Sequence, residues 1–254
     1  MNRWEFCTSA EIGQIIRAGM DMAILPVGAT EQHGAHLATG TDSLSAQWVA
    51  ERAAEKLGIL LLPTIAYGCS LGHTDHWPGT LSLGPLTLTQ LVLDIARWAA
   101  RSGIRRFLMF SGHATNAPAL ESAVLQLRYE LPKLRFRQLG IWEISPRVTT
   151  IYCRDGRDVH ANRAETSLLL HAAPHMVRAD LAFDVPDVTT ERFWSYDMPS
   201  TTPTGVVGRP SEASAEDGAT MAEVVVEDFA ALLQAALVED WPVVPRGPPD
   251  QDFP

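Results

Sequence analysis

The apolar residues of this 254-residue chain alternate between two patterns along its length. Short, nearly continuous apolar runs predict buried strands, and longer segments with apolar residues at helical spacing predict helices packed on them. The predicted strands are residues 22–27, 59–68, 105–112 and 134–142. The predicted helices are residues 9–18, 42–57, 86–103, 117–130, 162–171 and 215–238. This alternation indicates a three-layer α/β fold, in which a mainly parallel sheet carries helices on both faces.

The elements follow one another without an internal repeat, so we expect a single domain over residues 1–240. Residues 180–214 are rich in Pro, Thr and Ser and show no regular pattern. A loop of that length inside a compact domain is usually functional or packs on another subunit. Residues 241–254 are rich in proline and indicate an extended C-terminal tail.

Composition excludes several classes of protein. A hydrophobic content of 46% argues against disorder, and 30 acidic against 20 basic side chains argue against a nucleic-acid or membrane-surface partner. The three cysteines form no Cys-x-x-Cys pair, which suits a reducing compartment. The first residues carry no apolar run of signal-peptide length, and no stretch approaches the ~20 apolar residues of a membrane span. We therefore expect a cytoplasmic globular protein.

Histidine-bearing polar segments follow three of the predicted strands. They are residues 31–36, 68–80 and 111–116. Ligands of a parallel α/β sheet gather beyond the carboxyl ends of its strands, so these segments predict one site at that edge.

Four residues of these segments and of the next helix could bind metal. Glu31, His33, Asp42 and His113 form a mixed oxygen and nitrogen set, which suits zinc, manganese or iron. Two metals sharing one carboxylate would lie roughly 3.5–4 Å apart and activate a bridging water. Each residue alone also has a structural interpretation, Asp42 as a helix N-cap and the others as hydrogen-bonded loop residues. No compact motif such as His-Glu-x-x-His is present, so spacing alone leaves both interpretations open.

A second pair lies at the predicted helix 162–171. Glu165 follows His160 by five residues, and Asn162 between them is a candidate helix start. Glu165 is either a helix residue paired with Arg163, or a metal ligand or anchor with His160 as a proton shuttle.

The segment GCSLG at residues 68–72 matches Gly-x-Ser-x-Gly, the pattern of a nucleophilic serine. That motif needs a helix directly after the serine, whereas Pro78, Gly79, Gly84 and Pro85 follow here. A serine hydrolase built on Ser70 therefore remains an alternative that its context disfavours.

Five segments carry a more specific pattern: LPVGATEQHGAHL (25–37), the aspartate of GTD (40–42), WPGTLSL (77–83), SGHATN (111–116) and HANRAETS (160–167). In this order they resemble the successive motifs of the creatininase (creatinine amidohydrolase) family. The resemblance runs from about residue 20 to residue 180. It implies a single α/β domain, a homo-oligomer that is commonly a hexamer, and a two-metal centre. By resemblance, a metal-bridging hydroxide would cleave a C–N bond in a cyclic or linear amide.

The resemblance assigns Glu31, Asp42 and His113 to one metal and His33 and Asp42 to the other, with His160 as the catalytic histidine. It implies two divalent ions per chain, zinc or manganese, with iron also compatible. The family's glutamate ligand to the second metal falls at Thr115, which has no carboxylate. Glu165 is the expected substitute. The loss of that glutamate also motivates a third alternative, a non-catalytic homologue that lacks one metal.

Several substrate-contacting positions of creatininase differ here. Ala114, Gly156 and Arg157 replace side chains that touch its substrate, which argues against creatinine itself and for another small-molecule amide. We expect Arg157 to favour a carboxylate-bearing substrate if it faces the pocket rather than solvent. His73 and His76 are expected near the mouth of the site, where they would select substrate.

Overall fold

The computed structural model describes residues 2–242, and its centre is a five-stranded parallel sheet in the order β1-β3-β2-β4-β5. The strands are β1 (Asn2–Arg3), β2 (Met22–Val27), β3 (Leu60–Leu61), β4 (Arg106–Ser111) and β5 (Arg135–Gly140). All four strand pairings are parallel. The predicted mainly parallel sheet is confirmed.

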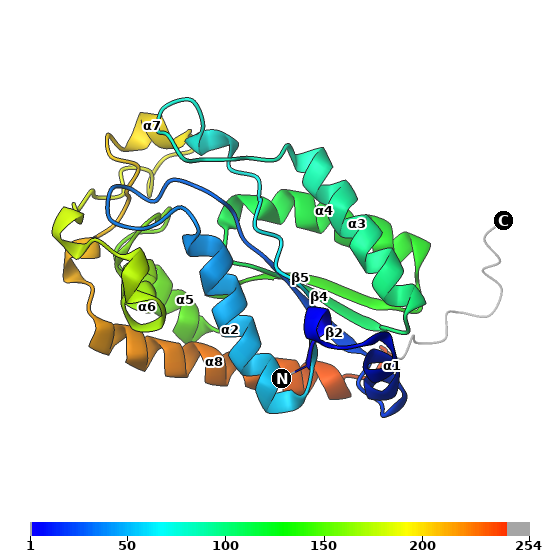
Figure 1. Cartoon of the computed structure of the whole chain (residues 1–254). Helices are drawn as coiled ribbons and strands as arrows, with labels where there is room; N and C mark the ends of the chain where they lie inside the picture. Colours follow the sequence, from blue (N-terminus) through cyan, green and yellow to red (C-terminus); the bar gives the residue numbers. More distant parts are fainter. Residues whose placement is uncertain (1, 243–254) are drawn as a thin grey trace, which may run out of the picture.

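Helices cover both faces of this sheet, which makes the three predicted layers (Figure 1). One face carries α2 (Thr41–Leu57), α5 (Pro146–Tyr152), α6 (Arg163–Ala172) and α8 (Ala215–Val238). The other face carries α1 (Ser9–Arg17), α3 (Pro85–Arg101) and α4 (Ala117–Glu130). A short helix, α7 (Met198–Thr201), lies in the irregular segment 180–214.

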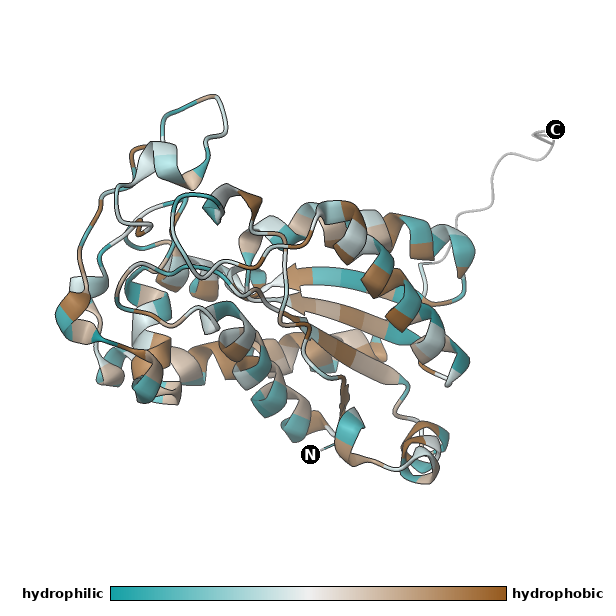
Figure 2. Cartoon of the chain, turned by 45° about the horizontal axis from the view of Figure 1, so that its top comes forward, coloured by the Kyte–Doolittle hydropathy of each residue, from teal (hydrophilic) through white to brown (hydrophobic). Residues whose placement is uncertain are grey.

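The central strand β2 explains why the sequence shows a continuous apolar run rather than an alternating one. All six of its residues are buried, because the side chains alternate between two cores. Ile24 packs with α2 and α8, and Leu25 packs with α3 and α4. Phe110 of β4 stacks on Phe229 of α8 with ring centroids 4.3 Å apart. Figure 2 shows this hydrophobic centre of the sheet enclosed by helices with hydrophilic outer faces.

The predicted strand 59–68 is mostly wrong, because β3 contains only Leu60 and Leu61. Pro63 follows two residues after Leu61 and cannot donate a backbone hydrogen bond to a neighbouring strand. The chain keeps contact with β2 only through isolated bonds, such as that from Gly28 N to Ile65 O at 2.8 Å.

Three of the strands and α-helices escaped prediction. β1 has only two residues, α7 has only four, and α5 has only seven, which is too short for a helical period to be evident. The start of α5 nevertheless carries a signal: Ser145 caps it through its hydroxyl and Pro146 is its first residue.

The irregular segment 180–214 folds back over the carboxyl end of the sheet rather than away from it. It pairs with the residues before α6, since His160 N donates to Val207 O at 2.9 Å and Val207 N donates to His160 O at 2.8 Å. Whether this loop acts in function or packs on another subunit stays a prediction.

Within residues 2–242, no helix is both long and apolar enough to cross a membrane. The boundary of the single domain at residue 240 stays a prediction. The predicted tail, residues 241–254, lies outside the described residues from position 243 onward.

Candidate metal centre

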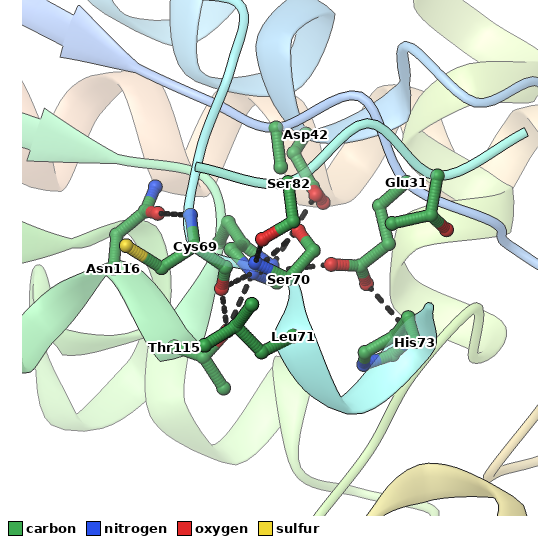
Figure 3. Close-up of polar contacts among 12 residues, drawn as sticks. Glu31, Asp42, Cys69, Ser70, Leu71, His73, Ser82, Thr115 and Asn116 are labelled. Carbon is green, nitrogen blue, oxygen red and sulfur yellow. Dashed lines mark hydrogen bonds and ion pairs between the residues drawn. The ribbon is translucent and has the colours of Figure 1, made fainter. Parts of the chain in front are cut away.

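Histidines and carboxylates from five separate segments meet beyond the carboxyl ends of β2 and β4. They are Glu31 and His33 after β2, Asp42 on the first turn of α2, His73 in a 3₁₀ turn, His113 after β4 and His160 before α6. All six are buried, with no more than 7% of any of them exposed. Figure 3 shows Glu31 reaching between His73 and the groups around Ser70, with Asp42 behind them.

Glycines allow these segments to come so close. A Cβ at Gly112 would collide with the backbone oxygen of Asp42, and one at Gly28 would collide with Ser43. The ends of β4 and β2 therefore pack directly against the first turn of α2, which brings Asp42 beside His113.

Asp42 lies between two histidines. Its Oδ1 is 3.1 Å from His33 Nε2, and its Oδ2 is 3.3 Å from His113 Nδ1. The two oxygens of this carboxylate thus face two different imidazoles, as expected of a ligand shared by two cations.

Glu31 also faces more than one histidine. Its Oε2 lies 3.1 Å from His113 Nε2, and its Oε1 lies 3.2 Å from His73 Nδ1 and 3.4 Å from His160 Nδ1. The ligand atoms fall into two groups, each within 4.8 Å: Glu31, His33 and Asp42, and Glu31, His73 and His160.

Three carboxylate oxygens in this cluster have no hydrogen-bond partner among the described residues: both oxygens of Glu31 and Oδ2 of Asp42. A buried carboxylate without hydrogen bonds or a counter-charge is strongly unfavourable. Divalent cations would supply that charge, and the carboxylate and imidazole donors are the types that zinc and manganese accept. The residues present therefore fit a metal centre.

Backbone carbonyls set the orientation of three of the imidazoles. His33 Nδ1 lies 3.1 Å from Glu31 O, His113 Nε2 lies 2.9 Å from Cys69 O, and His160 Nε2 lies 2.8 Å from Gln32 O. In the neutral form that donates to its carbonyl, each ring has a lone pair on its other nitrogen, which faces a carboxylate. Metal-binding histidines are commonly held this way.

Burial decides the pKa shift of three groups in the cluster. It raises the pKa of Glu31 to about 7, lowers that of His73 to about 3 and lowers that of His160 well below its usual value. Burial alone would also lower the pKa of His33, but Asp42 outweighs it and raises this pKa to about 10. His73 and His160 are therefore neutral, with lone pairs available.

Glu165 lies close to this cluster but has a structural contact as well. Its carboxylate accepts a hydrogen bond from Asn162 N at 3.2 Å and so caps α6. Burial raises its pKa, and His33 and Asp42 are near enough to influence it. Among the described residues, it is not part of either group of ligand atoms within 4.8 Å. Its role as a metal ligand stays a prediction.

A cavity of about 390 Å³ opens above the cluster. Asp42, His73, His113, His160 and Glu165 line its floor. Its walls comprise the small side chains Ala114, Thr115 and Cys153, the larger Trp142 and Tyr152, and Tyr196, Met198 and Thr201 from segment 180–214. A larger cavity of about 570 Å³, between β5 and α8, contains none of these histidines and lies at the other end of the strands.

The three residues expected to contact substrate lie in different places. Arg157 is exposed and lies at the rim of the 390 Å³ cavity. His73 is buried against Glu31 rather than at the mouth. His76 is exposed and packs on Trp77, outside the cavity lining that the described residues form.

Ser70 is buried beside the cluster, with its Oγ 3.2 Å from His113 Nε2. The residues after it, Leu71–His73, form a single 3₁₀ turn rather than the helix that a nucleophilic serine motif requires.

Comparison with known proteins places this geometry in a family. Residues 5–233 match the family model of creatininase, described as creatinine amidohydrolase. The chain belongs to the creatininase family. Family members are metal-dependent amidohydrolases, which confirms the predicted enzyme class.

Two relatives illustrate the range of the creatininase family. Creatinine amidohydrolase of Pseudomonas putida is 34% identical over 247 residues, 89% of this chain and 92% of its own length. Mycofactocin precursor peptide peptidase of Mycobacterium ulcerans (strain Agy99) is 34% identical over 223 residues, 81% of each chain.

Solved structures of creatininase agree with the fold and with the kind of metal. A crystal structure of creatinine amidohydrolase has a TM-score of 0.82 at 32% identity, covering 94% of this chain and 99% of that one. Similar structures include a manganese form of creatininase and a mutant described as Zn–Zn type. The prediction of divalent zinc or manganese as cofactor is confirmed at the level of the family.

Proposed function

We propose that this protein is a dinuclear metal-dependent hydrolase that cleaves a C–N bond in an amide bound in the 390 Å³ cavity. The observation that carries the proposal is a set of buried carboxylate oxygens of Glu31 and Asp42 that have no hydrogen-bond partner within residues 2–242 and that each face an imidazole nitrogen. Glu31, Asp42 and His113 would hold one cation. His33 and Asp42 would hold the second, with Glu165 beside them in place of the carboxylate absent at Thr115.

When bound, two divalent cations lower the pKa of water toward 7 and polarise a carbonyl oxygen. The chain itself supplies the proton transfer. His160 is neutral, and its Nε2 donates to Gln32 O, so its Nδ1 is free to take a proton from water and pass it to the leaving nitrogen. A positioned acid–base group of this kind contributes roughly 10²–10⁴-fold in rate.

The cavity supports an amide other than creatinine. The small side chains of Ala114 and Thr115 leave space on one wall, and Arg157 at the rim can pair with a carboxylate of the substrate. These features favour a carboxylate-bearing amide, from a small cyclic or linear compound up to the end of a short peptide.

A homo-oligomer, a hexamer by resemblance, and a cytoplasmic location belong to the same proposal. Large apolar side chains such as Leu86 and Tyr129 are 85% and 88% exposed, which supports a partner surface. Light scattering of the purified protein measures the oligomeric state.

The proposal is tested by a hydrolysis screen over cyclic and linear amides, with enzyme first depleted of metal and then restored with zinc or manganese. Activity should disappear on depletion and return on restoration. His113→Ala should abolish hydrolysis and lower the bound metal while its circular dichroism spectrum stays unchanged. Unchanged turnover in that variant would refute the site.

One observation favours a second candidate, a serine hydrolase. Ser70 Oγ lies 3.2 Å from His113 Nε2, and His113 Nδ1 lies 3.3 Å from Asp42 Oδ2, an arrangement like a catalytic triad. However, His113 Nε2 is also 2.9 Å from Cys69 O, so a proton on Nε2 occupies the position that would have to accept the serine's proton. A fluorophosphonate probe that labels Ser70, with activity that survives chelation, would favour this candidate.

A non-catalytic homologue is the remaining alternative. Two metal equivalents per chain support the enzyme, whereas one or none supports a binding protein.

A further inference from the structure

One oxygen of Glu31 is not used by the proposed pair of cations. Oε2 faces His113, on the side of Asp42, whereas Oε1 faces His73 at 3.2 Å and His160 at 3.4 Å. Glu31 is fully buried, and Oε1 has no hydrogen-bond partner among residues 2–242. A buried carboxylate oxygen in this state is stabilised by a hydrogen-bond donor or by a cation close to it.

The two histidines that face Oε1 can both present a lone pair to it. Gln32 O accepts from His160 Nε2 at 2.8 Å, which leaves His160 Nδ1 without a proton. His73 Nδ1 lies 2.9 Å from Gln32 Nε2. The same amide nitrogen is 3.2 Å from Gly205 O, so it can donate there instead and release His73 Nδ1.

We propose that Glu31 Oε1, His73 and His160 form a further site for a divalent cation such as zinc, and that a cation bound there inhibits the enzyme. The three ligand atoms lie within 4.8 Å of one another. Oxygen–nitrogen separations of 3.2 and 3.4 Å fit two ligands of one zinc ion at about 2.0–2.1 Å, with ligand–metal–ligand angles of roughly 100–110°. The inhibitory part of this proposal rests on the proposed function, because it requires His160 to carry a proton.

A cation at this site would inhibit the enzyme because it would occupy the lone pair of His160 Nδ1. His160 Nδ1 cannot bind a cation and carry a proton at the same time. His73 and His160 both line the cavity, so the cation would enter by the route that the substrate uses.

The test uses the full-length enzyme and His73→Ala, both stripped of metal and then dialysed against limiting or excess zinc. Bound zinc per chain is counted by plasma mass spectrometry, and hydrolysis is measured at each zinc level. At excess zinc the wild type should bind one more equivalent than the variant. Its rate should fall toward the roughly 10²–10⁴-fold lower rate expected without His160, while the variant resists this inhibition.

His76→Ala is the matched control, because His76 lies three positions away on the same loop but is exposed. It should keep the wild-type zinc count. His73→Asn provides a second variant, and circular dichroism verifies that both His73 variants are folded. Anomalous diffraction from zinc-soaked crystals would locate the additional ion directly.

The outcomes separate this inference from the proposed function. Two zinc equivalents in the wild type and in both folded His73 variants, at every zinc level, would overturn the further site alone. A wild type that binds no zinc and still hydrolyses amides would overturn the proposed function as well.

Discussion

The floor and the mouth of the cavity are built in different ways. Asp42 and His113 of the floor, and Glu31 and His33 beside them, lie just beyond strand ends or on a first helical turn, and at most 5% of any is exposed. The mouth is formed by irregular segments, where Arg157 is exposed and Tyr196 is 47% exposed. The sheet therefore fixes the groups that do chemistry, whereas loops present the groups that meet the substrate first.

Substitutions at the floor and at the mouth should therefore affect different steps of the reaction. His33 and His113 are held by packing and by hydrogen bonds to backbone carbonyls, and Asp42 lies between them, so a substitution there changes metal binding and the chemical step. A mouth side chain pairs with substrate in water, where a charged contact contributes little. Floor variants should therefore lower kcat, and mouth variants should mainly change KM.

The largest effect is expected at Asp42, because its two oxygens face both His33 and His113. Asp42→Asn removes the shared charged ligand. Activity should fall by more than about 100-fold, because substituting even a group that only supports a metal ligand lowers metal affinity or activity by roughly 10–100-fold. Initial rates and bound metal per chain measure the effect. A variant that keeps two equivalents of metal and its full rate would show that Asp42 is not shared.

His160→Ala is expected to have the next largest effect. The variant should lose roughly 10²–10⁴-fold in kcat, because the proton carrier is gone. With metal supplied at two equivalents, metal content should stay at the wild-type level, because His33, Asp42 and His113 remain. If metal falls in parallel with activity under these conditions, His160 is a ligand of the catalytic pair rather than its proton carrier.

Arg157→Ala tests the mouth. KM for a carboxylate-bearing amide should rise about fivefold to tenfold, which corresponds to about 1 kcal/mol for a partly solvated ion pair. Arg154→Ala is the control, because Arg154 is also exposed but lies outside the described cavity lining. A similar rise in KM for both variants, or a fall in kcat alone, would remove Arg157 from substrate binding.

The smallest effect concerns the support of the mouth by segment 180–214. Asp187 accepts hydrogen bonds from Arg157 N at 2.9 Å and Asp158 N at 3.1 Å. Burial opposes ionisation of Asp187, but bonds from Thr189, Asp158 and Arg157 outweigh it and hold its pKa below the usual 3.8. The resulting stability is present above about pH 4 and is lost as the pH falls through the lowered pKa of the folded state.

Urea unfolding at pH 7 and at pH 3 measures that contribution. The drop in midpoint between the two pH values should be smaller in Asp187→Asn than in the wild type. An identical drop in both proteins would mean that this carboxylate does not stabilise the mouth.

Much of the fold was predictable because the helices and central strands are long enough to show a period. The exceptions have local causes. Pro63 ends β3 after two residues, and α5 spans only seven residues, so neither shows a full hydrophobic pattern.

The floor was predictable for a related reason: polar residues after parallel strands must share one edge of the sheet. His73 and His76 show the limit of that reasoning. They lie three residues apart on one loop, yet one is buried against Glu31 and the other is exposed. Gln32 was missed because its contacts with His73 and His160 cross 41 and 128 positions of sequence. Such contacts depend on tertiary structure that no local pattern encodes.

The central claim is that Glu31, His33, Asp42 and His113 together hold a pair of cations. Anomalous diffraction from crystals grown with manganese tests it most directly. We predict two peaks that share Asp42, one beside Glu31 and His113 and the other beside His33. A map without peaks at these residues, or with their side chains turned away from one another, would contradict the account.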